Sequence, residues 1–282
     1  MANFEDQYRA LLQNIMLNGE HKTTRGHETK SIFGAQLRVD LRDEFPLLTC
    51  KKVHFKSIFW ELIMFLRGEN NVSFLQAQNV TIWDEWARED GDLGAVYGVQ
   101  WRKYQGATYA SNAQLPKIIK IDQLADVVAN IIHNPNSRRL LVSAWNPTQI
   151  DDMALPPCHY SFQFNANSEH EYLDLSFNMR STDVFLGLPF NIASYALLAH
   201  IVAKITNRKP RYLVANLADA HIYQDHAQQT NEYLGRTPMH APQLELTVDS
   251  LTLQQATMLT MQDITFTRAY ESHGRINAPV NV

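Results

Sequence analysis

Apolar residues recur along the chain at two spacings, one typical of helices and the other of strands. Over residues 4–16 they fall at every third or fourth position, and Gly19 can end the helix that this spacing predicts. Residues 57–68 and 191–205 are apolar almost throughout, which predicts two helices buried inside the protein. Two further helices are predicted over residues 121–137 and 222–233.

Short stretches with the composition of strands lie between these helices. They cover residues 31–40, 139–145, 161–164, 172–179, 211–216 and 243–248. Residues 20–30 are polar and are interpreted as a loop, and residues 105–115 as a surface insertion. Without an internal repeat or a long linker, the pattern predicts one domain over residues 1–282, of α+β (mixed α/β) class, with helices packed on a large mixed β-sheet.

The composition excludes several classes of protein. With 45% hydrophobic and 19% charged residues, the chain is too apolar to be disordered. Lys and Arg number 25 against 29 Asp and Glu, a net charge of −4. This balance argues against nucleic acid as a partner, because non-specific binding to it requires a basic surface. It leaves open a small anion bound at a local cluster of arginines.

Cysteine usage and hydropathy bear on the compartment. Two cysteines, Cys50 and Cys158, are too few for a disulfide framework or a cysteine-only metal site, so a reducing compartment is expected. The N-terminal segment has the pattern of an amphipathic helix rather than of a signal peptide. The apolar runs at 57–66 and 192–205 are shorter than the roughly 18–20 residues of a membrane span. We therefore expect a cytoplasmic protein (in the host cytoplasm, if a phage encodes it) with no membrane partner.

The motif Pro156-Pro157-Cys158-His159 is the sharpest local feature. Two prolines fix the backbone immediately before a cysteine, whose thiolate is a nucleophile where cations stabilise it. The alternative is a small buried apolar residue, which is the commoner state of a cysteine. Adjacent residues on a strand point to opposite faces, which argues against a dyad of Cys158 with His159.

Arginines next to serines form a second feature. The pairs Arg138-Arg139, which follows a serine, and Arg180-Ser181 offer guanidinium and hydroxyl donors that suit a phosphate, and Arg25 is a further candidate. Taken singly, each is as well explained as a solvated surface arginine. Arg138 and Arg139 lie between an apolar helix and an apolar strand, where full solvation is less natural.

Glu61 is a carboxylate among the apolar residues of a predicted buried helix. Burial would raise its pKa toward neutrality and prepare a general acid, unless the residue occupies a solvated stripe of the helix. Trp83, Trp86 and Trp101, together with Tyr97, either line an aromatic pocket or pack in the core, which is the commoner use of such residues.

Further polar residues suit hydrogen bonding to a ligand. Asn191 either caps the helix that follows it or presents its amide, which offers both a donor and an acceptor; capping is the better local interpretation. Asp219, His221 and Tyr223 alternate along a strand-like stretch, which places them on one face. A metal site would need more ligands close together, so none is predicted.

Taken together, these segments resemble the thymidylate synthase family. The matching stretches are residues 31–34 (SIFG), 45–52 (FPLLTCKK), 79–87 (NVTIWDEWA), 91–102 (GDLGAVYGVQWR), 134–147 (NPNSRRLLVSAWNP), 153–159 (MALPPCH), 180–203, 219–223 (DAHIY) and 276–282 (INAPVNV). The resemblance implies the fold of that family, a homodimer, and no metal. It also implies transfer of a one-carbon unit from 5,10-methylenetetrahydrofolate to C5 of dUMP, giving dTMP and dihydrofolate.

The resemblance also implies roles at the reacting atoms. Cys158 would add to C6 of the uracil and so make C5 nucleophilic. Glu61, acting through water, would supply protons near O4 and the folate N10, and Tyr97 would assist removal of the C5 proton. Asn191 would hold N3 and O4, the pattern of uracil rather than cytosine, and Asp183 would act beside these residues while facing the folate.

Other residues would bind the two substrates without reacting. The phosphate would lie among Arg25, Arg180 and Ser181, with Arg138 and Arg139 of the partner subunit. The ribose hydroxyl would be bound by His221 and Tyr223. The folate would be contacted by Lys51, Trp83, Asp183 and the tail ending in Val282, which would close over it.

Departures from the family pattern keep other functions open. Residues 25–30 read RGHETK where the family usually has RTGTGT, and the loop is one residue shorter. Met179 replaces the usual Gln, as in the dCMP hydroxymethylase branch, and Ala218 replaces a Gly.

The second function considered is a dUMP hydroxymethylase, in which water rather than hydride attacks the exocyclic methylene group. Methylation is favoured because Trp83 and the tail should exclude water. A third is a non-catalytic nucleotide-binding protein, against which the presence of Cys158, Glu61, Tyr97 and Asn191 argues.

Overall fold

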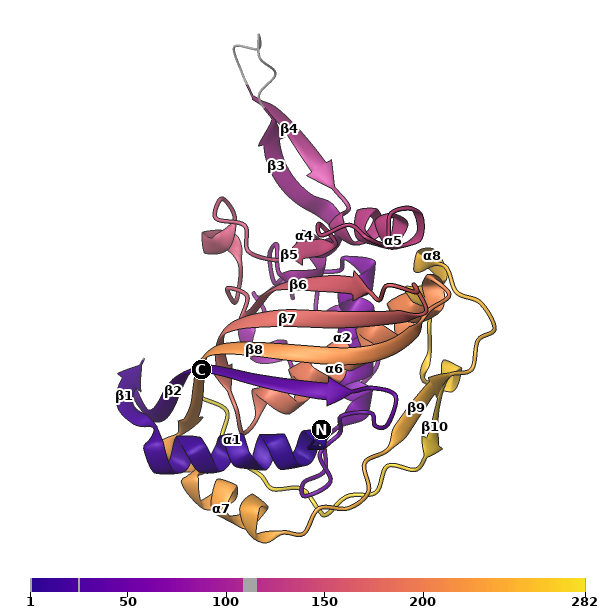
Figure 1. Ribbon diagram of the computed structural model, residues 1–282. Helices are drawn as coiled ribbons and strands as arrows, with labels where there is room; N and C mark the ends of the chain where they lie inside the picture. The colour runs from indigo at the N-terminus through magenta and orange to yellow at the C-terminus, as the bar shows by residue number, and fades with distance from the viewer. Residues whose placement is uncertain (1, 25, 109–115, 282) are drawn as a thin grey trace.

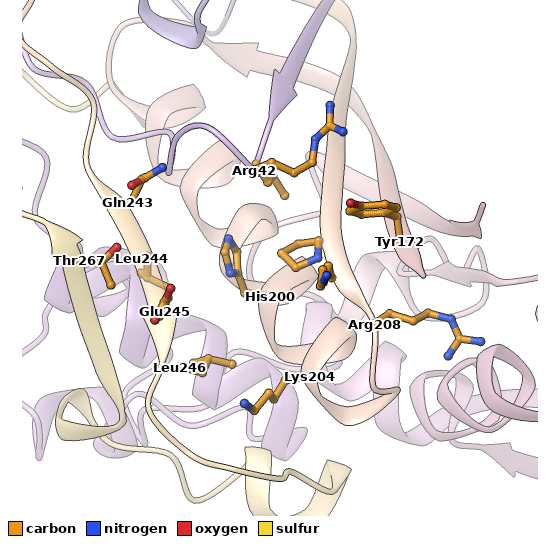
Figure 2. Close-up of a pocket in the computed structure, with 13 residues that line it drawn as sticks. Arg42, Tyr172, His200, Lys204, Arg208, Gln243, Leu244, Glu245, Leu246 and Thr267 are labelled. Carbon is orange, nitrogen blue, oxygen red and sulfur yellow. The ribbon is translucent and has the colours of Figure 1, made fainter. Parts of the chain in front are cut away.

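A six-stranded mixed sheet forms the centre of the computed structural model, which describes residues 2–24, 26–108 and 116–281 (Figure 1). The strand order is β1-β2-β8-β7-β6-β5, and β7 and β8 are parallel whereas the other neighbours are antiparallel. The strands are β1 (Glu20–Thr24), β2 (His27–Asp40), β5 (Leu141–Ser143), β6 (His159–Ala166), β7 (Tyr172–Asp183) and β8 (Lys209–Tyr223). This mixed sheet with packed helices confirms the α+β class.

Three long helices supply most of the core on one side of the sheet. They are α1 (Phe4–Asn18), α2 (Phe55–Arg67) and α6 (Gly187–Ile205). Helix α6 joins the parallel strands β7 and β8 and packs on both, as a parallel crossover requires. Helix α1 packs on β2 and β8, and α2 packs on α6. In Figure 1, α2 and α6 lie behind the sheet.

The remaining elements surround this centre. The shorter helices are α3 (Ser73–Gln76), α4 (Tyr97–Lys103), α5 (Gln123–His133), α7 (Ala227–Gly235) and α8 (Leu253–Ala256). Short 3₁₀ turns are η1 (Asp84–Trp86), η2 (Ile150–Asp152), η3 (Gln224–His226) and η4 (Met261–Asp263). Two small hairpins pair β3 (Tyr104–Thr108) with β4 (Lys117–Ile121) and β9 (Gln243–Leu246) with β10 (Ile264–Arg268).

Helix α6 is the most apolar element. It is long and apolar enough to cross a membrane by length and composition, because it begins four residues before the predicted start of residues 191–205. However, 72% of its most apolar window is buried inside the protein. Packing against β7, β8 and α2 therefore accounts for its composition.

The opposite face of the sheet carries a row of polar side chains. Gln36 Nε2 donates to Asn216 Oδ1 at 2.8 Å, and Asn216 Nδ2 donates to Asn178 Oδ1 at 3.0 Å. Asn178 Nδ2 in turn donates to Ser161 Oγ at 3.1 Å, so the row crosses β2, β8, β7 and β6. Figure 1 shows no helix in front of this face among the described residues.

Most predicted elements are confirmed, and three differences have physical reasons. Residues 20–30, interpreted as a loop, form the hairpin of β1 with the start of β2; β1 is exposed on both sides, so it lacks the alternation that reveals a strand. Residues 222 and 223 continue β8, so the helix predicted to start there begins at Ala227. The ends of the predicted insertion form the hairpin β3–β4, and residues 109–115 lie outside the described residues.

Candidate active site

A cleft of about 540 Å³ opens where β7 and β8 end and α6 begins. Parallel strands bring their carboxyl ends to one edge of a sheet, and the crevice there is the usual ligand site of such sheets. Several predicted residues line this cleft, namely Cys158, Arg180, Ser181, Asp183, Asn191, His221 and Tyr223. The fold thus brings together residues from the segment before β6 and from β7, α6 and β8 that the sequence separates by up to 65 positions.

Cys158 lies immediately before β6 and is partly exposed to the cleft. Its backbone N–H donates to Tyr97 Oη at 2.9 Å, and its Sγ lies 3.9 Å from Nη2 of Arg180. The guanidinium is held in place because it donates to the carbonyl oxygens of Pro156 at 3.0 Å and Pro157 at 2.9 Å. A fixed cation at this distance stabilises a thiolate, the nucleophilic form of cysteine.

His159 points into the core rather than toward the cleft. Its ring stacks on Tyr97 with centroids 4.1 Å apart, and its Nδ1 is hydrogen-bonded to Tyr195 Oη at 2.9 Å. Burial lowers the pKa of His159 to about 3, so the imidazole is neutral at physiological pH. These contacts agree with the alternation argument against a dyad with Cys158.

Glu61 is not among the residues that line the cleft, and its carboxyl group is paired with an indole. Trp83 Nε1 donates to Glu61 Oε1 at 2.7 Å, and the Trp83 ring contacts Tyr97 edge-on at 5.8 Å. Burial raises the pKa of Glu61 to about 7, against the opposing effect of this hydrogen bond. A contact path therefore runs from Glu61 through Trp83 and Tyr97 to the backbone of Cys158.

Asp219, which forms an ion pair with Lys22, fixes the orientation of His221. Asp219 accepts hydrogen bonds from Lys22 Nζ and from His221 Nδ1, each at 3.0 Å. Burial alone would raise the pKa of Asp219, but the hydrogen bonds of Lys22 and His221 lower it overall. With Asp219 ionised, Nδ1 of His221 carries a proton, and in the neutral ring Nε2 is an acceptor for a hydroxyl group.

Asp183 and Asn191 occupy the start of α6. Asp183 Oδ1 accepts the backbone N–H groups of Phe185 at 2.9 Å and Leu186 at 3.1 Å, before the first turn. The interpretation of Asn191 as a helix cap is wrong, because α6 begins at Gly187 and Asn191 lies inside it, lining the cleft. Its amide is thus placed for a ligand.

Other predicted residues lie away from the cleft lining. Lys51 is buried, donates to the carbonyl of Phe185, and lies 3.8 Å from the centroid of that ring. Burial lowers the pKa of Lys51 to about 8, opposed by Asp183. Arg138 and Arg139 are exposed between α5 and β5. Arg25 and Val282 lie outside the described residues.

The sequence interpretation missed part of the cleft. Lys22, Thr24, His27 and Thr29 all come from the β1–β2 hairpin, and Asn281 comes from the tail. The pairing of Thr24 with His27 and of Lys22 with Thr29 places these side chains at the cleft edge. Lys22 and Thr24 are two positions apart and would share one face of a strand, but the whole segment is polar, so this alternation did not indicate a strand.

The donors and acceptors present suit two organic substrates. Arg180, Ser181 and Lys22 supply positive charge and donors for a phosphate, Asn191 matches a lactam, and Asp183 offers a carboxylate to N–H donors. Over the described ranges of the chain, no group of three or more His, Cys, Asp or Glu could hold a metal ion.

One comparison with known proteins bears on these residues. A protein-family model described as thymidylate synthase matches residues 6–282 of this chain. The match therefore includes every element that lines the cleft.

Proposed function

Because this chain belongs to the thymidylate synthase family, whose members are folate-dependent enzymes that modify a nucleotide, we propose that it converts dUMP to dTMP with 5,10-methylenetetrahydrofolate. The observation that carries the proposal is one cleft holding Cys158, its fixed cation Arg180, and the amide of Asn191. A nucleophile, a phosphate donor set and a uracil-matching amide are what C5 alkylation of dUMP requires.

In the proposed first step, Cys158 Sγ forms a bond to C6 of the uracil. The C5–C6 double bond opens, and its electron pair moves toward C5 and O4. The amide of Asn191 would donate to O4 and accept from N3–H, which suits the developing negative charge and selects uracil. The geometry that supports this step is the guanidinium of Arg180 beside the sulfur.

Glu61 and Tyr97 would carry out the proton transfers. A carboxyl group with a pKa near 7 can both hold and release a proton at physiological pH, so Glu61 would act as the acid near O4, through water. Tyr97, whose hydroxyl already accepts the N–H of Cys158, would assist removal of the C5 proton. The bound folate supplies the one-carbon unit and, for methylation, the hydride.

The phosphate would be bound by Arg180 and Ser181 together with Arg25, and Lys22 adds charge at the same edge. The ribose hydroxyl would meet Nε2 of His221 and the hydroxyl of Tyr223. We assign the folate to the part of the cleft beside Asp183, with Trp83 shielding it from below. Lys51 would act there indirectly, by holding the Phe185 carbonyl next to Asp183.

A homodimer is part of the proposal. Arg138 and Arg139 are exposed and lie outside this cleft, which suits delivery to the cleft of a partner subunit. The polar row across the sheet also faces outward without a covering helix among the described elements, which suits an interface (Figure 1). A cytoplasmic location fits the low cysteine count.

A hydroxymethylase remains the second candidate because of Met179. This residue lines the cleft, and its side chain is buried beside Cys158, where most family members carry a hydrogen-bonding Gln. Loss of that amide changes the local polarity around the reacting atoms. Water attack on the exocyclic methylene would then give 5-hydroxymethyl-dUMP and tetrahydrofolate.

Mass spectrometry of the products separates the candidates. Purified enzyme is incubated with dUMP and 5,10-methylenetetrahydrofolate, and we expect a methylated nucleotide together with dihydrofolate. A hydroxymethylated nucleotide with tetrahydrofolate would establish the second function instead. If neither product forms while dUMP binds, the protein is the non-catalytic nucleotide-binding protein. The same assay with dCMP in place of dUMP is the control for Asn191.

A further inference from the structure

His226 is a fully buried imidazole between the cleft and the C-terminal tail. It ends the 3₁₀ turn η3, directly after β8, and has no exposed surface. Its Nε2 donates to the carbonyl oxygen of Pro279 at 2.8 Å. Because a carbonyl only accepts, this contact fixes the ring orientation and places a proton on Nε2. One side of the ring therefore anchors the tail.

The adjacent Asp225 anchors the tail a second time. Its two carboxylate oxygens accept from Nδ2 of Asn281 at 3.1 and 3.2 Å. Asn281 is also one of the residues that line the cleft. Two successive residues of η3 thus bind alternate residues of the tail, 279 and 281, and bring the second of them to the cleft.

The other side of the His226 ring faces residues of the site. Its Nδ1 lies 3.9 Å from Asp183 Oδ2, and no hydrogen-bond partner of Nδ1 is found among the described residues. Phe185 contacts the ring with centroids 5.7 Å apart and Tyr223 at 5.4 Å. A displaced ring would therefore move the segment 183–185, which carries the carboxylate proposed to face the folate.

We propose that His226 and Asp225 are positioning residues that hold the tail over the cleft and keep Asp183 in place for the folate. The part of the inference that concerns folate rests on the proposed function. The contact between η3 and the tail does not rest on the proposed function, because it is present in the protein without any substrate. Among the described contacts, Arg180 and Asn191, the side chains assigned to the phosphate and the pyrimidine, do not touch this ring; of the residues assigned to the nucleotide, Tyr223 at the ribose does, so nucleotide binding should be affected less than folate binding.

The first test measures the tail without any substrate. Arg275 is exposed just before the tail, and the rate of native-state trypsin cleavage after it, followed by intact mass, reports local opening. In His226→Asn the shorter amide cannot reach Pro279, and we expect cleavage about tenfold faster, as loss of one buried hydrogen bond predicts. In His226→Gln the amide nitrogen reaches the Nε2 position, so the rate should stay near that of the wild type.

A second variant keeps the test independent of core packing. Asp225 is exposed, so Asp225→Ala should fold normally, and we expect cleavage about threefold to fivefold faster. Asp249→Ala, which removes an exposed acid from a loop far along the chain, is the matched control and should cleave like the wild type.

The third measurement links the tail to the folate. In His226→Asn the Michaelis constant for 5,10-methylenetetrahydrofolate should rise about tenfold while that for dUMP changes less than twofold. Unchanged cleavage in both His226→Asn and Asp225→Ala would overturn the proposal, as would a loosened tail with an unchanged folate constant. Both of these results concern the variants only and leave wild-type turnover intact, so neither would contradict the proposed function. A wild type that forms no product would instead overturn that function, and the cleavage rates would still report on the tail.

Discussion

Cys50 lies in the core beside the carboxylate of Glu5, whereas Cys158 lies at the cleft beside the guanidinium of Arg180. Burial, together with Glu5, raises the pKa of Cys50 to about 12, although Arg9 Nη1, which lies 3.5 Å from the sulfur, opposes the effect. Cys158 is partly exposed and has a fixed cation 3.9 Å from its sulfur. Each sulfur thus has a guanidinium beside it, and the two side chains differ in chemistry because burial and the carboxylate of Glu5 outweigh the cation at Cys50, whereas Cys158 is open to the cleft.

The largest difference between the two cysteines should appear when each sulfur is removed in turn. Cys158→Ala should lower kcat by at least about 10⁴-fold, because the covalent step is lost, while dUMP still binds. Cys50→Ala should retain turnover, since that residue is buried in the core and is not among the residues that line the cleft. Turnover in a Michaelis–Menten assay and dUMP affinity by calorimetry check both variants. Full activity of Cys158→Ala would contradict the proposed mechanism.

The second test compares thiol reactivity without turnover. At pH 8 a thiol with a pKa near 12 is almost entirely protonated, so iodoacetamide should alkylate Cys158 at least about 10³-fold faster than Cys50 in the native protein. Arg180→Gln should slow the alkylation of Cys158 about tenfold. Peptide mass spectrometry over time gives both rates, and equal rates at the two sulfurs would remove the basis of the comparison.

The third test concerns the carboxyl group of Glu61, which is linked to Cys158 by contacts through Trp83 and Tyr97. The pKa of Glu61 is raised from its ordinary 4.5 to about 7, so the folded state binds this proton more tightly than the unfolded state does. The wild type should therefore lose about 1–3 kcal/mol of unfolding free energy, relative to Glu61→Gln, as pH rises from about 4.5 to 7.

Above pH 7 and below pH 4.5 the difference in unfolding free energy between the two proteins should stay constant, because Glu61 then has the same protonation state in the folded and the unfolded protein. Urea denaturation at five pH values measures it. A difference that does not change with pH would show that the carboxyl group of Glu61 is solvated, and the site would then lack the neutral acid that the proposed mechanism uses.

Much of the fold was predictable because long apolar patterns report burial directly. Residues 57–68 and 191–205 could only be core helices, and both are. Gly68 ends the first of these helices with φ +65°, a backbone conformation that favours glycine, and a side chain there would also meet Arg102. The β1 strand was not predictable, because it is exposed on both sides and is held by backbone pairing with β2 and by the bond of Lys22 to Asp219, which depend on the folded arrangement.

Site residues could be predicted where a sequence motif identified them, and could not be predicted where only contacts between distant segments bring them together. Pro-Pro-Cys and Arg-Ser pointed to Cys158 and Arg180, which the cleft brings within 3.9 Å. Nothing in the spacing indicated that Trp83 would bind Glu61, because that contact depends on how a loop crosses α2. His226 was missed for the same reason, since its partner Pro279 is 53 residues away.

The antiparallel pairing of β2 with β8 has a consequence for folding kinetics. Ser31 and Asp219, which are hydrogen-bonded across this pair, are 188 residues apart in the sequence. Closing so long a loop is entropically unfavourable, and sheets built from such distant strands form slowly. The helices and the antiparallel pair β6–β7 can form early because their contacts are local, but the edge that carries His221 and Lys22 forms only after β2 and β8 have paired. Acquisition of ligand binding should therefore lag behind acquisition of helical signal during refolding.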